Sequence, residues 1–305
     1  MNVKISLMMP VKNQADEARL TVRNALDVLE GTDHEVIVVD DDSTDGCCHD
    51  MPSNVLVHRT RGATQSSNTA RRIGGKLATG DVLIWSDPHC RYPTGSLPAL
   101  AKTAMDTGQL VMAASLPWPK KRVVYGTCYG LCDRGLASVR CWNPKSRKTP
   151  VLYGTVYAVR KDVYKKLGGW PKLPGVWGCA ELSLSLLGWF AGVDVICRDD
   201  IVCTHKARKS YTPDGGLFSY HVDRSDTAGN AHFMHGAFFP STYETFWKPI
   251  LAKTWGKRSK FWKANDSAEF KHLRRQIEKT RKRSEAGFYK QVLDMEVPTN
   301  VIGTA

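Results

Sequence analysis

The feature that most constrains the fold is a regular alternation of two kinds of segment along the first part of the chain. Short apolar runs with the length of β-strands are separated by stretches in which apolar residues recur at helical spacing. In residues 17–30, for example, Val22, Ala25 and Leu29 share one helical face. Such alternation is typical of βαβ units, so we expect an α/β fold with a mostly parallel sheet flanked by helices. The predicted strands are residues 3–9, 35–40, 55–58, 81–86 and 109–114.

Polar side chains follow two of these runs at the point where each ends. Asp40 and Asp41 close the run at 35–40, and Asp87-Pro88-His89 follows the run at 81–86. In open α/β sheets, ligands bind beyond the carboxyl ends of the strands. We therefore expect the two polar groups to converge on one crevice.

The Asp87-x-His89 pattern places a carboxylate and an imidazole where they can reach one divalent cation together. A later strand-like run, Ile201 to Thr204, delivers His205 as a candidate third ligand. One oxygen donor and two nitrogen donors suit manganese or another transition ion better than a site built for magnesium alone. Taken in isolation, the same pattern is compatible with a solvated turn, and His205 with an ordinary core or surface histidine.

Several further short motifs follow one another in a fixed order. They are Ser6-Leu7-Met8-Met9-Pro10-Val11-Lys12-Asn13, Val38-Val39-Asp40-Asp41-Asp42-Ser43-Thr44-Asp45, Ala70-Arg71-Arg72-Ile73-Gly74, Asp87-Pro88-His89-Cys90, Leu167-Gly168-Gly169-Trp170, Val176-Trp177-Gly178, Glu181-Leu182-Ser183 and His205-Lys206-Ala207-Arg208. As a series they resemble nucleotide-sugar glycosyltransferases with the GT-A fold, a Rossmann-like architecture. The first half resembles glycosyltransferase family 2. The second half resembles the catalytic domain of polypeptide N-acetylgalactosaminyltransferases, and the similarity ends near residue 235.

The resemblance implies a uridine diphosphate (UDP) sugar as donor and a divalent cation, Mn²⁺ or another, as cofactor. It assigns the cation to Asp87, His89 and His205. It also implies which positions meet the donor nucleotide: Pro10, Asn13 and Asp41 on the uridine side, and Arg71, Asp87, Arg208 and Tyr211 toward the diphosphate. For Arg71 and Arg208, a surface salt bridge is the competing interpretation.

The segment from Trp177 to Glu181 is expected to face the donor sugar and the acceptor. The resembling transferases carry two or three carboxylates there, whereas this chain has Trp177, Gly178 and the single acid Glu181. If transfer inverts the anomeric carbon, Glu181 is the available catalytic base. If transfer retains it, the departing phosphate can take the proton and no base is needed. Glu181 at a helix start, favoured by the helix dipole, is the structural alternative.

Charge and cysteine content limit the possible partners and compartment. The formal net charge is +13, and basic residues dominate from 248 to 290. The nine cysteines show no disulfide-framework spacing, so we interpret them as reduced thiols of a cytoplasmic protein. No secretory signal or membrane-spanning run is apparent, so no membrane partner is expected. Nothing in the sequence indicates the oligomeric state.

The predicted organisation is a GT-A catalytic domain at 1–245 and a basic helical C-terminal extension at 246–305. Within the first, 1–115 would form the nucleotide-binding half and 116–245 the metal and acceptor half, with 116–150 a mobile connection. The predicted activity is transfer of a hexose or N-acetylhexosamine to a hydroxyl.

Several acceptors remain open on the sequence alone. The leading acceptor is DNA with a hydroxymethylated base, as in phage DNA modification, because of the basic C-terminal region. The alternatives are a Ser/Thr polypeptide, a lipid or polysaccharide, and a non-catalytic nucleic-acid-binding protein on a decayed transferase fold.

Overall fold

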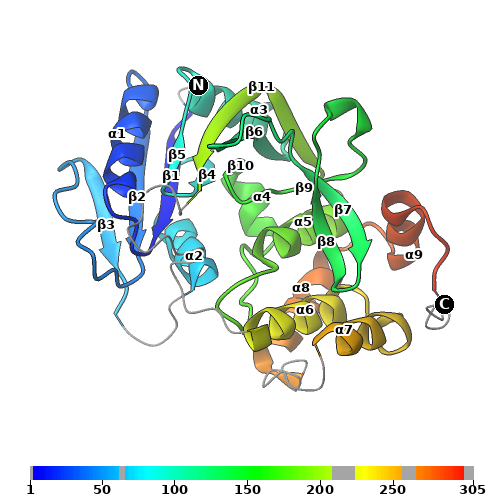
Figure 1. Cartoon of the computed structure of the whole chain (residues 1–305). Helices are drawn as coiled ribbons and strands as arrows, with labels where there is room; N and C mark the ends of the chain where they lie inside the picture. Colours follow the sequence, from blue (N-terminus) through cyan, green and yellow to red (C-terminus); the bar gives the residue numbers. More distant parts are fainter. Residues whose placement is uncertain (1–2, 62–65, 208–223, 256–265, 299–305) are drawn as a thin grey trace.

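A computed structural model describes residues 3–61, 66–207, 224–255 and 266–298. Its centre is an eight-stranded sheet in the order β3-β2-β1-β4-β10-β6-β11-β5 (Figure 1). Only β10 and β5 run against the other six strands, which confirms the mostly parallel sheet expected from the sequence. The strands are β1 (Ile5–Val11), β2 (His34–Asp40), β3 (Val55–Arg59), β4 (Val82–Ser86), β5 (Cys90–Arg91), β6 (Leu110–Trp118), β10 (Val156–Arg160) and β11 (Val195–Lys206).

Side-chain alternation along the strands divides the core into two layers. Along β1, Leu7 and Met9 point into one hydrophobic cluster while Met8 points into the other, as a period of two requires. The first cluster is covered by helices α1 (Glu17–Leu29) and α3 (Ser96–Thr107), whose apolar faces pack on it. The predicted face of α1, with Val22, Ala25 and Leu29, is the buried one.

The second layer is larger and includes the C-terminal part of the described chain. Buried side chains of α5 pack in the same cluster as Trp85 of β4, together with Leu273 and Phe288 from the C-terminal helices. Figure 1 shows α6, α7 and α8 grouped together, with α9 beside the small sheet. The helices on this side are α2 (Ser67–Leu77), α4 (Lys161–Lys166), α5 (Ala180–Ala191), α6 (Arg224–Phe238), α7 (Lys248–Trp255), α8 (Ala268–Thr280) and α9 (Glu285–Phe288).

The prediction of a mobile connection at 116–150 is wrong. This part of the chain forms a second, three-stranded sheet in the order β8-β7-β9, built from β7 (Thr127–Cys132), β8 (Gly135–Arg140) and β9 (Pro150–Val151). These strands are hard to recognise in the sequence because the segment is rich in Pro, Gly, Lys and Arg. Few of its apolar residues pack inward, and Tyr129 and Leu136 are among them.

A buried histidine of α6 holds the β7–β8 hairpin in place. His235 is fully buried; its Nε2 accepts a hydrogen bond from the Leu136 amide at 2.9 Å, and its Nδ1 donates to the Ala231 carbonyl at 2.7 Å. Burial lowers the pKa of His235 to about 3, so the neutral ring persists in the folded protein.

We expect His235 to make the fold less stable in acid. Because its folded pKa lies below the unfolded value of about 6.5, the unfolded chain binds the extra proton, and the free energy of unfolding falls as the pH drops from about 6.5 toward 3. In His235→Leu this part of the pH dependence should disappear, while stability at neutral pH falls by about 1–3 kcal/mol from the unpaired Leu136 amide. Urea denaturation across pH measures both quantities.

The exposed His272 of α8 provides a control, since His272→Leu removes a histidine and should retain the part of the pH dependence that His235 causes. If the free energy of unfolding depends on pH equally in the wild type and in His235→Leu, His235 is not the cause of the acid dependence.

Candidate active site

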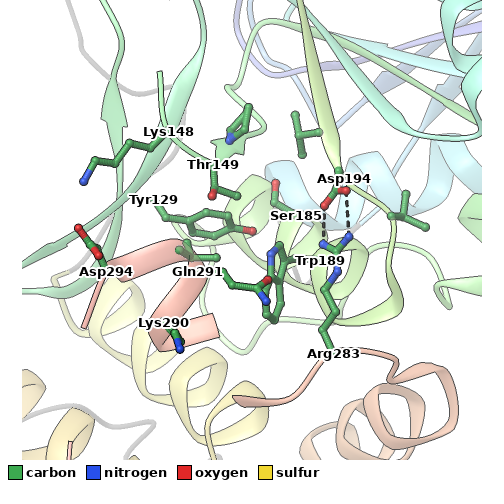
Figure 2. Close-up of a pocket in the computed structure, with 14 residues that line it drawn as sticks. Tyr129, Lys148, Thr149, Ser185, Trp189, Asp194, Arg283, Lys290, Gln291 and Asp294 are labelled. Carbon is green, nitrogen blue, oxygen red and sulfur yellow. Dashed lines mark hydrogen bonds and ion pairs between the residues drawn. The ribbon is translucent and has the colours of Figure 1, made fainter. Parts of the chain in front are cut away.

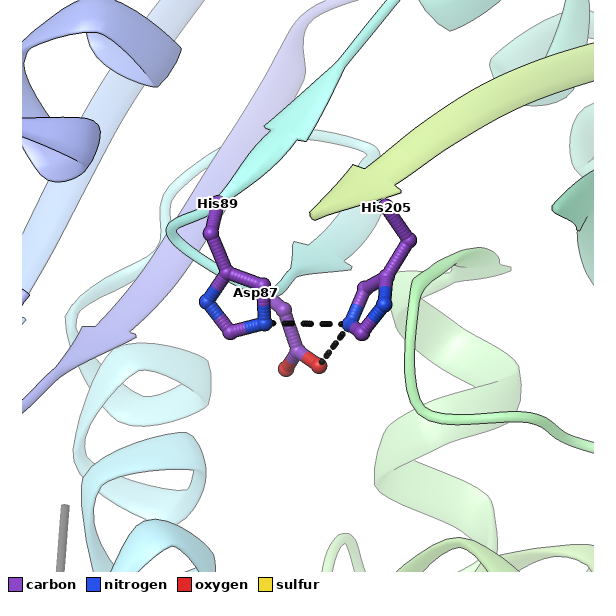
Figure 3. Close-up of side chains that lie close together, drawn as sticks. All are labelled: Asp87, His89 and His205. Atoms are coloured by element: carbon purple, nitrogen blue, oxygen red, sulfur yellow. Dashed lines mark hydrogen bonds and ion pairs between the residues drawn. The ribbon is translucent and has the colours of Figure 1, made fainter. Parts of the chain in front are cut away.

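Three side chains from two separate parts of the sheet converge at its carboxyl edge (Figure 3). Asp87 and His89 lie in the turn between β4 and β5, and His205 lies near the end of β11. Pairing of β5 with β11 places His205 opposite Cys90 and so brings the two histidines together. Their Nε2 atoms are 3.0 Å apart, and His205 Nε2 is 3.3 Å from Asp87 Oδ2.

The donor atoms of this cluster fit a divalent cation. One carboxylate oxygen and two imidazole nitrogens lie within 4.8 Å of one another. Burial alone would raise the pKa of Asp87, but the hydrogen bond to His205 and the charge of Arg71 lower it below its ordinary value, which keeps the carboxylate ionised. Mixed oxygen and nitrogen donors suit manganese or a similar ion.

Arg71 of α2 joins the cluster to Glu181. The arginine is 6% exposed, and its Nη2 lies 3.4 Å from Asp87 Oδ1 and 2.8 Å from Glu181 Oε1. Its Nε donates to the Tyr157 hydroxyl at 3.1 Å. Burial would lower the pKa of Arg71, but the charges of Glu181 and Asp87 and the contact with Tyr157 together outweigh burial and raise that pKa. The guanidinium thus forms a buried ion pair, where the competing interpretation expected a surface salt bridge, and its contact with the donor stays a prediction.

Glu181 stands in the first turn of α5, directly after a tightly turned segment. Gly178 and Cys179 have φ values of +91° and +63°, so the chain enters the helix through two left-handed residues. The side-chain amide of Asn230 on α6 fixes this segment by donating to the carbonyls of Trp177 at 2.8 Å and Gly178 at 3.1 Å. Sequence reasoning missed Asn230, which lies more than fifty positions after the segment that it holds.

The positions expected to meet the uridine lie at the ends of β1 and β2. Pro10 pairs with Val39 in the sheet, and the Asp41 amide donates to the Val11 carbonyl at 2.8 Å. Asp41 Oδ1 accepts a hydrogen bond from Thr60 at 2.9 Å. The remaining predicted donor contacts, Arg208 and Tyr211, lie outside the described residues.

The turn around Asn13 is tied to the acidic segment that follows β2. Asn13 Oδ1 accepts from the Thr44 amide at 2.8 Å, and the Asn13 amide donates to Ser43 Oγ at 3.1 Å. Gln14, the next residue, lies 3.1 Å from the His89 ring. Sequence reasoning missed Gln14, although its place directly after Asn13 in the first strand-to-helix turn was a usable signal.

Two of the cavities that adjoin α5 differ in their relation to the candidate site. One of about 330 Å³ lies beside Glu181 and is lined by Gly154, Leu182 and Trp255 among others. The other, of about 600 Å³, is lined by Ser185 and Trp189 of the same helix together with Tyr129 and the C-terminal segment (Figure 2). Glu181 lines the smaller cavity but not the larger one, so the smaller cavity is the one that adjoins the candidate active site.

Several basic residues of the C-terminal region are engaged within the protein. Arg283 pairs with Asp194 at 2.9 Å, Arg281 lies over the Phe190 ring at 4.5 Å, and Arg274 donates to the Ala237 carbonyl at 2.9 Å. These three arginines thus contribute to packing. Of the basic residues that suggested DNA binding, Lys257, Arg258, Lys260 and Lys263 lie outside the described residues.

Within the part of the chain that the structure describes, no helix has both the length and the apolar character needed to cross a bilayer.

Comparisons with known proteins agree with this geometry. Human polypeptide N-acetylgalactosaminyltransferase 15 is 25% identical over 239 residues, which cover 70% of this chain and 36% of that protein. The crystal structure of GalNAc-T7 with UDP, GalNAc and Mn²⁺ has the same fold, with a TM-score of 0.70 at 16% identity over 96% of this chain and 57% of that one. A second structure, the mannosyltransferase PcManGT from Pyrobaculum calidifontis with GDP-Man and Mn²⁺, gives a TM-score of 0.52 at 18% identity, covering 92% of this chain and 74% of that one.

These likenesses confirm the GT-A fold, and the chain spans 36% of the length of its human relative. The model of the family "Glycosyl transferase family 2" matches residues 6–168, which is more than half of the chain. The resemblance of the first half is thereby confirmed, and the chain belongs to glycosyl transferase family 2.

Proposed function

We propose that this chain is a cation-dependent glycosyltransferase that moves a hexose or N-acetylhexosamine from a UDP sugar to a Ser or Thr hydroxyl of a polypeptide. The observation that carries the proposal is the cluster of Asp87, His89 and His205 at the carboxyl edge of the sheet, with Glu181 joined to it through Arg71. A bound cation would offset the charge that develops on the diphosphate as the sugar departs.

The donor assignment draws on position in the fold. Pro10, Asn13 and Asp41 lie at the ends of two paired strands, where open α/β sheets bind nucleotides. GalNAc-T7, whose fold this chain shares, is known with UDP and Mn²⁺. In this proposal Asp87 has two roles, since Oδ2 faces the cation site while Oδ1 is held by Arg71.

The acceptor assignment draws on the cavity beside Glu181 and on the C-terminal arginines. The cavity is lined largely by apolar groups, such as Leu136, Leu152 and Trp255, which suit a peptide side chain better than a phosphate backbone. Because Arg274, Arg281 and Arg283 pack within the protein, part of the reason for a DNA acceptor is lost. Hydroxymethylated DNA remains the second acceptor to test.

We propose that Glu181 positions groups at the site instead of acting as a base. The Glu181 carboxylate lies 2.8 Å from a buried guanidinium and is turned toward that partner. In front-face transfer the acceptor oxygen bonds to the anomeric carbon as the carbon–phosphate oxygen bond breaks. The hydroxyl proton passes to the departing phosphate oxygen. Because the acceptor attacks from the face that the phosphate leaves, the anomeric configuration is retained.

If the cation site is correct, removal of a side chain that holds the ion should abolish both Mn²⁺ binding and turnover. His89→Ala and Asp87→Ala should remain folded by circular dichroism, lose Mn²⁺ binding measured by electron paramagnetic resonance, and lose sugar transfer. Chelation of the wild type should abolish transfer and added Mn²⁺ should restore it. His272→Ala, on the exposed face of α8, is the matched control. Full turnover in excess chelator would rule out the site.

The role of Glu181 predicts a limited effect of Glu181→Gln. The amide can still accept from Arg71, so turnover should fall by less than about 100-fold, the scale expected for a lost general base. The anomer of the product, read by NMR, should match that of the donor. Glu278→Gln, which changes an ion pair on α8, is the control. A larger fall together with an inverted product would identify Glu181 as the base.

To test the acceptor, the chain is incubated with UDP-hexoses and UDP-N-acetylhexosamines and with one of three acceptors. The acceptors are Ser/Thr peptides, DNA carrying hydroxymethylated bases and neutral glycans. Mass spectrometry measures the gain of mass by each acceptor. We expect the peptides to gain the mass of one sugar residue, and the reaction to need Mn²⁺. Transfer to DNA alone would replace the polypeptide assignment, and absence of both transfer and donor hydrolysis would point to a non-catalytic protein.

A further inference from the structure

We infer that Gln14 is a positioning residue that orients His89 toward the cation and that Asp45 holds Gln14 in place. The inference rests on the cation site proposed above. It assigns a role to Gln14, which the proposed chemistry does not otherwise use, and it connects the nucleotide side of the crevice with the cation site.

The amide of Gln14 has a fixed orientation. Gln14 is 5% exposed, and its Nε2 donates to the Lys12 carbonyl at 2.9 Å. The nitrogen is committed to that carbonyl, so the oxygen is the atom that faces His89, where Oε1 lies 3.1 Å from Nδ1. An amide oxygen can only accept a hydrogen bond, and therefore Nδ1 of His89 must carry the proton.

This tautomer leaves the lone pair of His89 Nε2 directed at the other two members of the cluster. Nε2 is the atom that lies 3.0 Å from His205 Nε2. Histidines that ligate metals commonly donate their second ring nitrogen to a fixed acceptor, which sets both the tautomer and the ring orientation. Without Gln14 the ring would lose that acceptor and could rotate or adopt the other tautomer.

The turn that carries Gln14 is itself held from outside. Its neighbours Asn13 and Ala15 have φ values of +48° and +47°, a conformation that non-glycine residues seldom adopt without support. The support comes from the segment after β2, where Asp45 Oδ2 accepts from the Ala15 amide at 2.7 Å. The acidic turn therefore restrains Gln14, and through it the His89 ring.

The backbone on the other side of His89 is anchored separately. The hydroxyl of Thr21 on α1 lies 3.0 Å from the Pro88 carbonyl and 3.1 Å from the Cys90 carbonyl. With the backbone fixed in this way, the rotation of the imidazole is the remaining freedom, and Gln14 restricts it on the Nδ1 side while His205 lies on the Nε2 side.

The experiment measures Mn²⁺ affinity of the full chain by electron paramagnetic resonance, without nucleotide or acceptor. Gln14→Met keeps the size of the side chain and removes the acceptor, and we expect it to weaken Mn²⁺ binding by about 10- to 100-fold. Gln14→Glu keeps an acceptor oxygen and should bind more tightly than the Met variant. Asp45→Ala should fall between wild type and Gln14→Met.

A matched control separates orientation of the ring from general loosening of this region. Asn24 of α1 also holds the segment after β4, by accepting from the Tyr92 amide at 2.7 Å, but it does not contact the imidazole. Asn24→Ala should keep Mn²⁺ affinity close to that of the wild type. Long-range ¹⁵N NMR of the rings should show His89 protonated at Nδ1 in the wild type and a mixture of tautomers in Gln14→Met.

Two results would overturn the inference, and they differ from failure of the cation site. If the wild type binds Mn²⁺ and Gln14→Met binds it equally well, Gln14 does not position His89. If Asn24→Ala and Gln14→Met weaken binding equally, the effect is one of local stability. If the wild type itself does not bind Mn²⁺, the cation site fails and this inference fails with it.

Discussion

One buried arginine side chain organises the candidate site. The guanidinium of Arg71 lies between Asp87 and Glu181, which come from segments almost one hundred residues apart in the chain. A buried charge is tolerated only when it is paired, so Arg71, Asp87 and Glu181 depend on one another. The hydrogen bond from Arg71 to Tyr157 and the packing of Trp170 against the guanidinium, at 5.8 Å, complete its surroundings. Loss of Arg71 would leave two carboxylates without their shared partner, whereas loss of either carboxylate leaves Arg71 with the other.

Much of the first half of the fold could be predicted from local pattern. The apolar runs before Asp40 and Asp87 have strand length and strand composition, and parallel strands meet at a shared edge, so the convergence of their ends follows from topology. The small sheet at 127–151 could not be predicted in this way. Its strands are short, their partners lie within the same polar segment, and the packing that stabilises them comes from α6 and the C-terminal helices.

The site shows the same division. Asp87, His89 and His205 could be predicted from the sequence because each follows a strand-like run. Gln14 and Asn230 act through contacts with residues 75 and 52 to 55 positions away, which no local spacing reveals. Arg71 shows a further limit: its residue type was compatible with a phosphate contact or a surface salt bridge, and only the position of Glu181 in space reveals the buried ion pair.

The order of strands has a consequence for how such a chain can diversify. β6 and β10 are hydrogen-bonded neighbours, and the whole small sheet is an excursion between the end of one and the start of the other. Because the excursion leaves and re-enters the central sheet at adjacent strands, it can be lengthened, shortened or exchanged without changing the order of any other strand. It also supplies part of the wall beside Glu181. Substrate range can therefore evolve in a replaceable module, while the edge of the sheet that carries Asp87 stays as it is.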